Sequence, residues 1–398
     1  MLERLERLPT DPILGLMAAF RGDADPRKVD LGVGVYRDDH GNTPVVRAVA
    51  QAEQAVLARQ STKTYVAPAG NAGFNQAMER LVLGEDHPAL SAGRVRTIQS
   101  PGGCGAVRLG AEIIRVASPQ AVVHVSSPTW ANHVPLVTGS GLELARYPYF
   151  DAPSGTVNFE AMLGAFDKLP ARSVVLLHAS CHNPTGADLS EAQWRELLRV
   201  VKQRGLLPFI DMAYQGLGVG VAEDAFGPRL FSAELPEVLI AVSCSKNFGL
   251  YRERTGALTT VSESAGAADA ALSQLVRIAR SMYSMPPDHG AAIVYEILSK
   301  EDLRRSWTEE LSGMRNRIQG LRTELVKRLA TAYPQRSFGY IATQRGMFSY
   351  LGIDTPQVRE LREKNHVYMT DDSRINIAGL STENLPYFAE SVAQVLKQ

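Results

Sequence analysis

The stretch Leu206-Leu207-Pro208-Phe209-Ile210 is a short, nearly continuous apolar run that ends at Asp211. Runs of this kind, bounded by turn residues, are typical of strands that lie buried on both faces of a parallel sheet. Similar patterns predict further strands at residues 94–98, 121–125, 173–177 and 238–242. The central part of the chain is therefore expected to form a sheet with little solvent on either side.

A well-marked helix precedes this run. Ser190 and Gln193 are three positions apart and form a capping box, and apolar residues then recur at helical spacing from Trp194 to Val201. Gly205 is suited to end the helix. Because strand–helix–strand units repeat along the chain, the predicted fold class is α/β, with a large domain whose mostly parallel sheet is covered by helices on both faces.

The chain is predicted to contain two domains. Residues 1–45 form an N-terminal arm and part of a small domain, residues 46–310 form the large domain, and residues 311–398 complete the small one. Helical periodicity dominates the C-terminal part of the sequence, and short strands are expected at 346–350 and 374–377. The smaller domain is therefore predicted to be of the α+β type.

The composition argues against several classes of protein. The 398 residues include 42 Lys and Arg against 42 Asp and Glu, and this balance does not suit a nucleic-acid-binding protein. Three cysteines are too few for a disulfide framework, and no zinc-binding motif is present, so we expect no metal. The N-terminus lacks the apolar core of a signal peptide, and no apolar stretch reaches the roughly 18 residues of a membrane span. We therefore expect a cytoplasmic protein that acts on small molecules, without membrane or nucleic-acid partners.

Polar residues follow the predicted strands at the edge of the sheet where a site is expected. Asn183, Asp211 and Lys246 each come a few residues after a strand, and sites in such sheets lie beyond the carboxyl ends of the strands. A lysine in a partly desolvated pocket can form a Schiff base, and a buried carboxylate can face a protonated pyridine nitrogen. Taken singly, a solvated lysine and a helix-capping aspartate are the commoner roles of such residues.

A glycine turn adds a third element to this set. Gly102-Gly103-Cys104-Gly105 stands immediately before a predicted helix, where backbone N–H groups and the helix dipole favour an anion. A lysine, a carboxylate and a phosphate-binding turn together match the requirements of pyridoxal phosphate.

Three segments resemble those of fold-type I, class I aminotransferases: residues 181–186, 211–216 and 243–249. Three more resemble the bacterial aspartate and aromatic amino-acid branch of that family: residues 11–16, 31–36 and 372–379. The resemblance runs in order along essentially the whole chain.

The resemblance implies pyridoxal phosphate as the cofactor and assigns three catalytic residues. Lys246 would hold the cofactor as a Schiff base and shuttle a proton, Asp211 would keep its pyridine nitrogen protonated, and Tyr214 would act with Asn183 on its phenolate oxygen. The other implied cofactor-binding residues are the stacking Trp130 and a phosphate cradle of Gly102, Gly103, Cys104, Ser243, Ser245, Arg254 and, from the neighbouring subunit, Tyr65.

The same resemblance implies the substrate contacts and a homodimer with cross-subunit active sites. Arg374 would clamp the substrate α-carboxylate, with a backbone contact from Gly34 and further contacts from Trp130 and Asn183. Arg280 would reach across the dimer to a side-chain carboxylate.

Two positions depart from the family pattern. Cys104 stands where relatives commonly carry Thr or Ser, and a thiol is a weaker hydrogen-bond donor than a hydroxyl. Met285 stands where aspartate-specific relatives commonly carry Asn, and its adaptable apolar side chain suits an aromatic ring better than a second carboxylate.

The expected activity is transfer of the amino group of Tyr or Phe, and also of Trp and Asp, to 2-oxoglutarate by a ping-pong route. An aspartate aminotransferase is the alternative within this class. Outside it, the alternatives are a pyridoxal-phosphate-dependent lyase or decarboxylase and a non-enzymatic regulator with the same fold. The presence of Lys246, Asp211 and Arg374 together argues against the regulator.

Overall fold

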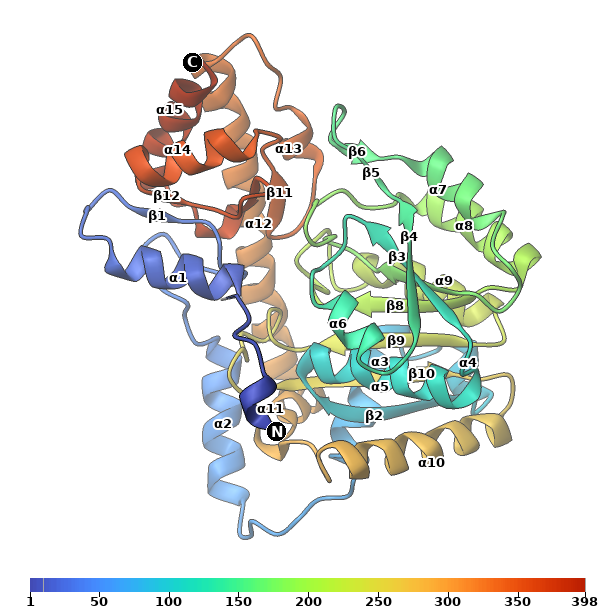
Figure 1. The fold of residues 1–398 in the computed structure, drawn as a ribbon. Coiled ribbons are helices and arrows are strands. Elements are labelled where there is room, and N and C mark those ends of the chain that lie inside the picture. The colour runs from blue at the N-terminus through green and yellow to red at the C-terminus, as the bar shows by residue number, and fades with distance from the viewer. Residues whose placement is uncertain (10, 398) are drawn as a thin grey trace. The chain divides into compact units, whose positions relative to one another are not determined.

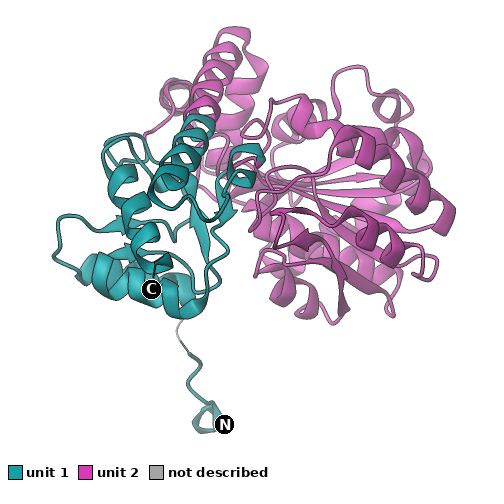
Figure 2. Cartoon of the chain, turned by 90° about the horizontal axis from the view of Figure 1, so that it is seen from above, with its two compact units in different colours: residues 1–43, 318–343, 347–398 teal, residues 44–317, 344–346 magenta. Residues whose placement is uncertain are grey.

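The protein is described from a computed structural model, which covers residues 1–9 and 11–397. The chain forms two compact units (Figure 2). The larger one contains residues 44–317 and 344–346, and the smaller one residues 1–43, 318–343 and 347–398. The boundary between them falls within the long helix α12 (Glu301–Ala332).

A seven-stranded sheet forms the centre of the larger unit (Figure 1). Its strands are β2 (Val95–Pro101), β3 (Val122–Ser127), β4 (Glu143–Pro148), β7 (Val174–His178), β8 (Leu207–Met212), β9 (Val238–Ser243) and β10 (Thr255–Val261). They are ordered β2-β10-β9-β8-β7-β3-β4. All neighbouring pairs are parallel except those that β10 forms with β2 and β9. The predicted mostly parallel sheet is therefore confirmed. A separate hairpin is formed by β5 (Phe150–Asp151) and β6 (Thr156–Val157).

Strand β10 lies inside the sheet although the sequence analysis did not anticipate it. Every residue of this strand is buried, including three threonines. Two of these hydroxyl groups have partners within the sheet: Thr259 Oγ1 lies 2.8 Å from Thr97 Oγ1 on β2, and Thr260 Oγ1 donates to the Arg96 carbonyl at 3.2 Å. Threonines paired across strands can thus fill a buried strand that does not show an apolar run.

Helices cover both faces of this sheet, as predicted. α5, α6 and α10 pack together on one face, and α3, α7, α8 and α9 form a continuous layer on the other. Leu239 and Ala241 of β9 belong to the apolar core beneath α5, whereas Ile240 between them is equally buried but points the other way. The helices of this unit are α2 (Arg47–Arg59), α3 (Ala72–Leu83), α4 (Pro88–Ser91), α5 (Gly102–Ala117), α6 (His133–Thr138), α7 (Phe159–Phe166), α8 (Glu191–Arg204), α9 (Phe226–Glu234), α10 (Ala265–Met282) and α11 (Asp288–Ser299), with a 3-10 turn η2 (Glu223–Ala225).

Helix α8 begins and ends where the sequence predicted. The Ser190 side chain accepts from the Gln193 backbone N–H, and the Gln193 side chain accepts from the Ser190 N–H, which completes the capping box. Gly205 adopts the left-handed conformation with φ 61°, which a residue without a Cβ adopts at low cost.

The smaller unit combines helices with two short sheets. β1 (Val29–Asp30) pairs in parallel with β12 (Val367–Tyr368), and β11 (Phe348–Tyr350) pairs antiparallel with β13 (Arg374–Asn376). The remaining elements are η1 (Leu2–Arg4), α1 (Pro12–Gly22), α13 (Tyr340–Thr343), α14 (Thr355–Asn365), η3 (Ile377–Gly379), α15 (Asn384–Leu396) and the end of α12. Both predicted short strands overlap observed ones.

A fully buried arginine connects α12 to this small sheet. The Arg322 guanidinium donates to the Ile341 carbonyl at 2.9 Å, to the Phe348 carbonyl at 2.6 Å and to the Ser349 hydroxyl at 2.6 Å. A buried charge is tolerated only when it is hydrogen-bonded, and here two of the bonds go to the strand that carries Phe348 and one goes to α13.

We expect Arg322→Leu to lower the free energy of unfolding by about 3 kcal/mol, because the substitution leaves two buried carbonyls without their donor. Urea titration followed by circular dichroism measures this. Arg328→Leu is the matched control: Arg328 lies on the same helix in a half-exposed ion pair with Glu324 at 2.7 Å, and its loss should cost less than about 1 kcal/mol. Equal losses in the two variants would contradict a special role of Arg322.

Candidate active site

Lys246 lies in the loop between β9 and β10, beyond the carboxyl end of the parallel strands. Its Nζ atom is 4.9 Å from the centroid of the buried Tyr214 ring. Burial lowers the pKa of Lys246, although the nearby Asp211 carboxylate acts in the opposite direction. A larger share of this amine is therefore neutral, and able to act as a nucleophile, than would be the case for a solvated lysine.

Asp211 lies near the end of β8 with only 6 % of its surface exposed. Burial alone would raise its pKa, but a 3.0 Å hydrogen bond from His133 Nε2 to its Oδ2 atom, together with the charge interactions of His133 and Lys246, lowers the pKa below its usual value. His133 is held in turn through Nδ1, which is 2.8 Å from Thr129 Oγ1. The carboxylate therefore stays ionised in a nearly dry site.

Behind this pair the larger unit stacks two further histidines and a tyrosine. The ring centroids of His133 and His178 are 5.1 Å apart, those of His178 and His182 4.1 Å, and those of His182 and Tyr149 4.2 Å. Burial lowers the pKa of His178 to about 3, and that of His182 well below its usual value. Both rings are neutral at physiological pH, so they add no positive charge around Asp211.

His133 and His178 are buried and hydrogen-bonded, which is the common role of histidines inside a protein. His133 also contacts Asp211 directly, and the sequence did not predict this contact. No motif spacing indicates this contact, because it joins α6 to β8 across the sheet.

The glycine turn, Ser243 and Arg254 are brought together at the first turn of α5. A Cβ atom at Gly102 would lie 2.6 Å from Arg254 Nη2, and one at Gly103 would lie 3.0 Å from Ser243 Cβ, so only glycine allows this approach. Arg254 Nη1 also donates to Ser245 Oγ at 3.4 Å. Backbone N–H groups, two hydroxyls and a guanidinium thus surround a position suited to an anion.

Cys104, Trp130 and Asn183 complete the residues predicted for this unit. Cys104 is partly exposed in the first turn of α5, and the Trp130 ring meets the His133 ring edge-on at 5.3 Å. Asn183 is buried, and its Oδ1 atom has no hydrogen-bond partner among the described residues. A buried amide in this state is suited to a polar ligand atom.

The substrate residues predicted in the smaller unit lie around Phe348. The Arg374 guanidinium carbon is 4.6 Å from the centroid of the Phe348 ring, and Arg374 Nη2 donates to the Gly32 carbonyl at 2.6 Å. A Cβ atom at Gly34 would lie 2.8 Å from Phe348 Cζ. Asn376 Nδ2 donates to the Val33 and Val35 carbonyls at 2.7 and 2.8 Å and so fixes the backbone on both sides of Gly34.

Phe348 and Asn376 therefore position the predicted substrate residues, and the sequence analysis assigned neither of them a role. Asn376 stands in the segment 372–379, so its polar side chain beside Arg374 offered a signal. Phe348 offered no such signal, because an aromatic residue in a predicted strand most often packs in the hydrophobic core.

Tyr65 and Arg280 are the two residues predicted to act across a dimer. Tyr65 is 91 % exposed in the loop that follows α2, and Arg280 is exposed in the last turn of α10. No hydrogen bond or ion pair within the described part of the chain holds the Arg280 side chain. Their cross-subunit roles stay predictions.

The chain is similar to known proteins along almost its whole length. Residues 26–392 match the family model described as aminotransferase class I and II. The chain is 46 % identical over 392 residues to an aromatic-amino-acid aminotransferase of Pseudomonas aeruginosa, covering 98 % of each chain. It is 42 % identical over 396 residues to an aspartate aminotransferase of the same organism, covering 100 % of each.

Solved structures are equally similar. An aromatic-amino-acid aminotransferase from Burkholderia pseudomallei, covalently bound to pyridoxal phosphate, superposes with a TM-score of 0.97 at 45 % identity, covering 100 % of this chain and 99 % of that one. Within residues 1–9 and 11–397, no helix is long and apolar enough to cross a membrane, and no group of three His, Cys, Asp or Glu side chains could hold a metal ion.

The buried histidines make stability depend on pH. Between pH 6.5 and 5 the unfolded chain takes up a proton on His178, whereas the folded protein does not, because its pKa is about 3. The unfolded state binds more protons, so stability falls as the pH is lowered through this range, by about 2 kcal/mol for one such group.

We therefore expect the free energy of unfolding to fall less between pH 6.5 and pH 5 in His178→Gln than in the unsubstituted protein. Urea unfolding at the two pH values measures this. His40→Gln, in an exposed turn, should leave the pH dependence unchanged. An unchanged slope in His178→Gln would mean that His178 is protonated in the folded protein.

Proposed function

The chain belongs to the class I and II aminotransferase family, and we propose that it is an aromatic-amino-acid aminotransferase that uses pyridoxal phosphate. The amino group of Tyr or Phe, and also of Trp and Asp, would pass to 2-oxoglutarate in a ping-pong reaction. The single observation that carries this proposal is the buried, ionised Asp211 in the electrostatic reach of Lys246, whose pKa is lowered by burial.

The residues present fit the cofactor. Gly102 and Gly103 leave space beside Arg254 and Ser243 that any Cβ atom would fill, which suits a phosphate group. The unpartnered Asn183 amide oxygen marks a second polar contact, because a buried amide is satisfied when a ligand atom reaches it. Lys246, Asp211, Tyr214, Asn183, Ser243, Ser245, Arg254 and the turn at Gly102, Gly103 and Cys104 would hold pyridoxal phosphate, with Trp130 stacked on its ring.

When bound, pyridoxal phosphate supplies an electron sink for the carbanion left by removal of the substrate Cα proton. Asp211 keeps a proton on the pyridine nitrogen, since an ionised carboxylate favours a cation beside it. Lys246 would accept the substrate Cα proton on Nζ and later release a proton, a role that requires a neutral amine. Its lowered pKa meets this requirement.

Arg374 would bind the substrate α-carboxylate. Its guanidinium lies over the Phe348 ring with one Nη atom committed to the Gly32 carbonyl, so the fork has a fixed plane. A fixed plane orients the bound carboxylate and, through it, the Cα–H bond. A lysine at position 374 would keep the charge but lose this orientation.

Preference for aromatic substrates rests on the relatives and on Met285. Relatives named for aromatic amino acids reach 46 % identity, and one named tyrosine aminotransferase, from Rhizobium meliloti, reaches 47 %. Aspartate aminotransferases reach 42 %. Met285 supports the same choice, because its apolar side chain suits a ring.

The homodimer and the cytoplasmic location belong to the proposal as well. Tyr65 is 91 % exposed, and the exposed Arg280 has no ion pair within the described residues, which suits side chains that complete a partner's site. Balanced charge and only three cysteines suit a reducing compartment.

The first test is the visible absorbance of the protein loaded with pyridoxal phosphate. We expect L-Phe to convert the cofactor to its amino form faster than L-Asp at equal concentration. Faster conversion by L-Asp would favour the aspartate aminotransferase alternative. Lys246→Ala should lose the lysine-bound absorbance band, and a band that persists in this variant would contradict the assignment of Lys246.

Arg280 is expected to distinguish acidic from aromatic substrates. If it pairs with the side-chain carboxylate, Arg280→Ala should reduce kcat/KM for L-Asp by about a hundredfold and for L-Phe by less than about tenfold, because a charge-assisted pair is worth about 3 kcal/mol. Steady-state kinetics with both substrates measures this. Equal losses would contradict the assignment.

Cys104 is expected to weaken the phosphate cradle slightly. Cys104→Ser restores a hydroxyl donor and should retain the cofactor better during dialysis, whereas Cys104→Ala should not. Identical retention in the serine and alanine variants would show that the side chain at this position does not bind the phosphate.

A further inference from the structure

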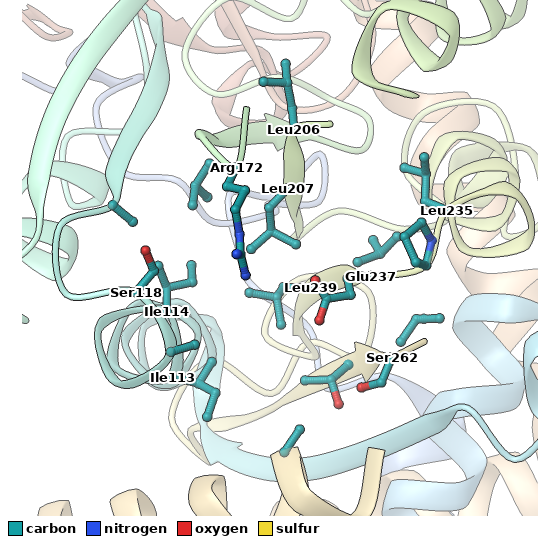
Figure 3. A pocket seen from close by; sticks show the side chains of 18 of the residues that line it. Ile113, Ile114, Ser118, Arg172, Leu206, Leu207, Leu235, Glu237, Leu239 and Ser262 are labelled. Atoms are coloured by element: carbon teal, nitrogen blue, oxygen red, sulfur yellow. The ribbon is translucent and has the colours of Figure 1, made fainter. Parts of the chain in front are cut away.

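A second cavity opens at the opposite edge of the same sheet. Its volume is about 550 Å³, and it lies at the amino ends of β7, β8 and β9, beside the carboxyl end of β10 (Figure 3). Leu207 at the start of β8 lines this cavity, whereas Asp211 near the end of that strand belongs to the candidate active site. The cavity is therefore separated from Asp211 and Lys246 by the length of the strands.

The floor of the cavity is apolar. Ile114, Val174, Leu206 and Leu239 line it with less than a tenth of their surface exposed, and the partly buried Ile113 adds to the wall. Small-molecule sites have volumes of roughly 300–1,000 Å³ and are lined mainly by apolar side chains with a few polar groups. This cavity has both properties.

Two exposed residues of opposite charge, Arg172 and Glu237, line the rim of the cavity. In Figure 3 the Arg172 side chain points inward toward Leu239, with Glu237 on the far side of that leucine. Neither side chain has a hydrogen bond or an ion pair within the described residues. Lys202, which also lines the cavity, is already paired with Glu234 at 2.9 Å. Among the described residues that line the cavity, the charged side chains without an ion pair are thus one cation and one anion.

The backbone at Arg172 is also unusual. Its φ of 67° lies in the left-handed region, and its N–H donates to the Gly205 carbonyl at 2.8 Å. Glycine adopts this conformation more readily than arginine, so the turn itself does not require an arginine. What an arginine adds at this position is its charged side chain.

We propose that this cavity binds an α-amino acid with a bulky apolar side chain. The α-carboxylate pairs with Arg172, the α-ammonium with Glu237, and the side chain lies on the floor formed by Ile114, Leu206 and Leu239. A simple fatty acid or an apolar amine would pair with only one of the two charged side chains. A sugar would make few apolar contacts with the floor of the cavity. This site is distinct from the one proposed for catalysis, and it does not depend on the proposed function.

The experiment uses the holoenzyme with ¹³C-labelled isoleucine methyl groups. The Ile113 signal, assigned with Ile113→Val, reports on the cavity and not on the candidate active site. L-Phe is the ligand, and two analogues are the controls: 3-phenylpropionate lacks the ammonium group, and 2-phenylethylamine lacks the carboxylate. We expect L-Phe to shift the Ile113 signal saturably and to bind about tenfold more tightly than either analogue.

Two variants test the assigned contacts. Arg172→Gly suits the left-handed backbone and should fold normally with unchanged aminotransferase activity, but should weaken L-Phe binding at Ile113 by about tenfold. Glu237→Gln should weaken L-Phe but not 3-phenylpropionate. Arg374→Ala, which impairs the candidate active site, should leave the Ile113 titration unchanged.

Four results would overturn the proposal, and the last of them concerns Glu237. The first is the absence of a saturable shift at Ile113, and the second is a shift that Arg172→Gly leaves unaltered. The third is a shift that disappears in Arg374→Ala, because it would then originate at the active site. Equal affinity for 3-phenylpropionate and L-Phe would exclude the role of Glu237 and with it an amino-acid ligand. If the protein showed no aminotransferase activity, the Ile113 titrations would still test this proposal.

Discussion

The hydrogen bond between His133 and Asp211 is the interaction on which the candidate active site depends. A buried carboxylate tends to take up a proton, and a protonated Asp211 could not favour a positive charge on a pyridine nitrogen. His133 opposes this with a 3.0 Å hydrogen bond, and the positive charge of Lys246 acts in the same direction. Thr129 fixes the other ring nitrogen at 2.8 Å, so the ring is oriented from both sides.

The neutral histidines behind this pair serve the same end. His178 and His182 fill the wall with rings that remain uncharged, since burial lowers the pKa of each. Charged rings at these places would attract the Asp211 carboxylate and compete with a cationic ligand. The site therefore holds its negative charge on the Asp211 carboxylate, beside two uncharged histidine rings. This arrangement lowers the free energy of unfolding only at acidic pH, where the histidines of the unfolded chain take up protons.

The smaller unit solves a different problem, which is to orient a guanidinium. Arg322 donates to the Phe348 carbonyl and the Ser349 hydroxyl of strand β11. The Phe348 ring of this strand lies under Arg374 and against Gly34. Asn376 fixes the segment that contains Gly34. A buried charge far from any reaction thus supports, through one aromatic ring, the residue proposed to bind the substrate.

Local patterns in the sequence determined the α/β class, the mostly parallel sheet, the limits of α8 and the residues that follow the strands. These features depend on periodicity and caps within a few residues. The resemblance to a family supplied the roles of Lys246, Asp211 and Arg374. Only the tertiary structure decided that His133 contacts Asp211, 78 positions away, and that Arg374 contacts Gly32, 342 positions away. Such contacts follow from the order of strands and the packing of helices, and no spacing along the chain encodes that order. The antiparallel β10 and the cavity at the far edge of the sheet were decided in the same way, because both arise where segments distant in sequence pack together.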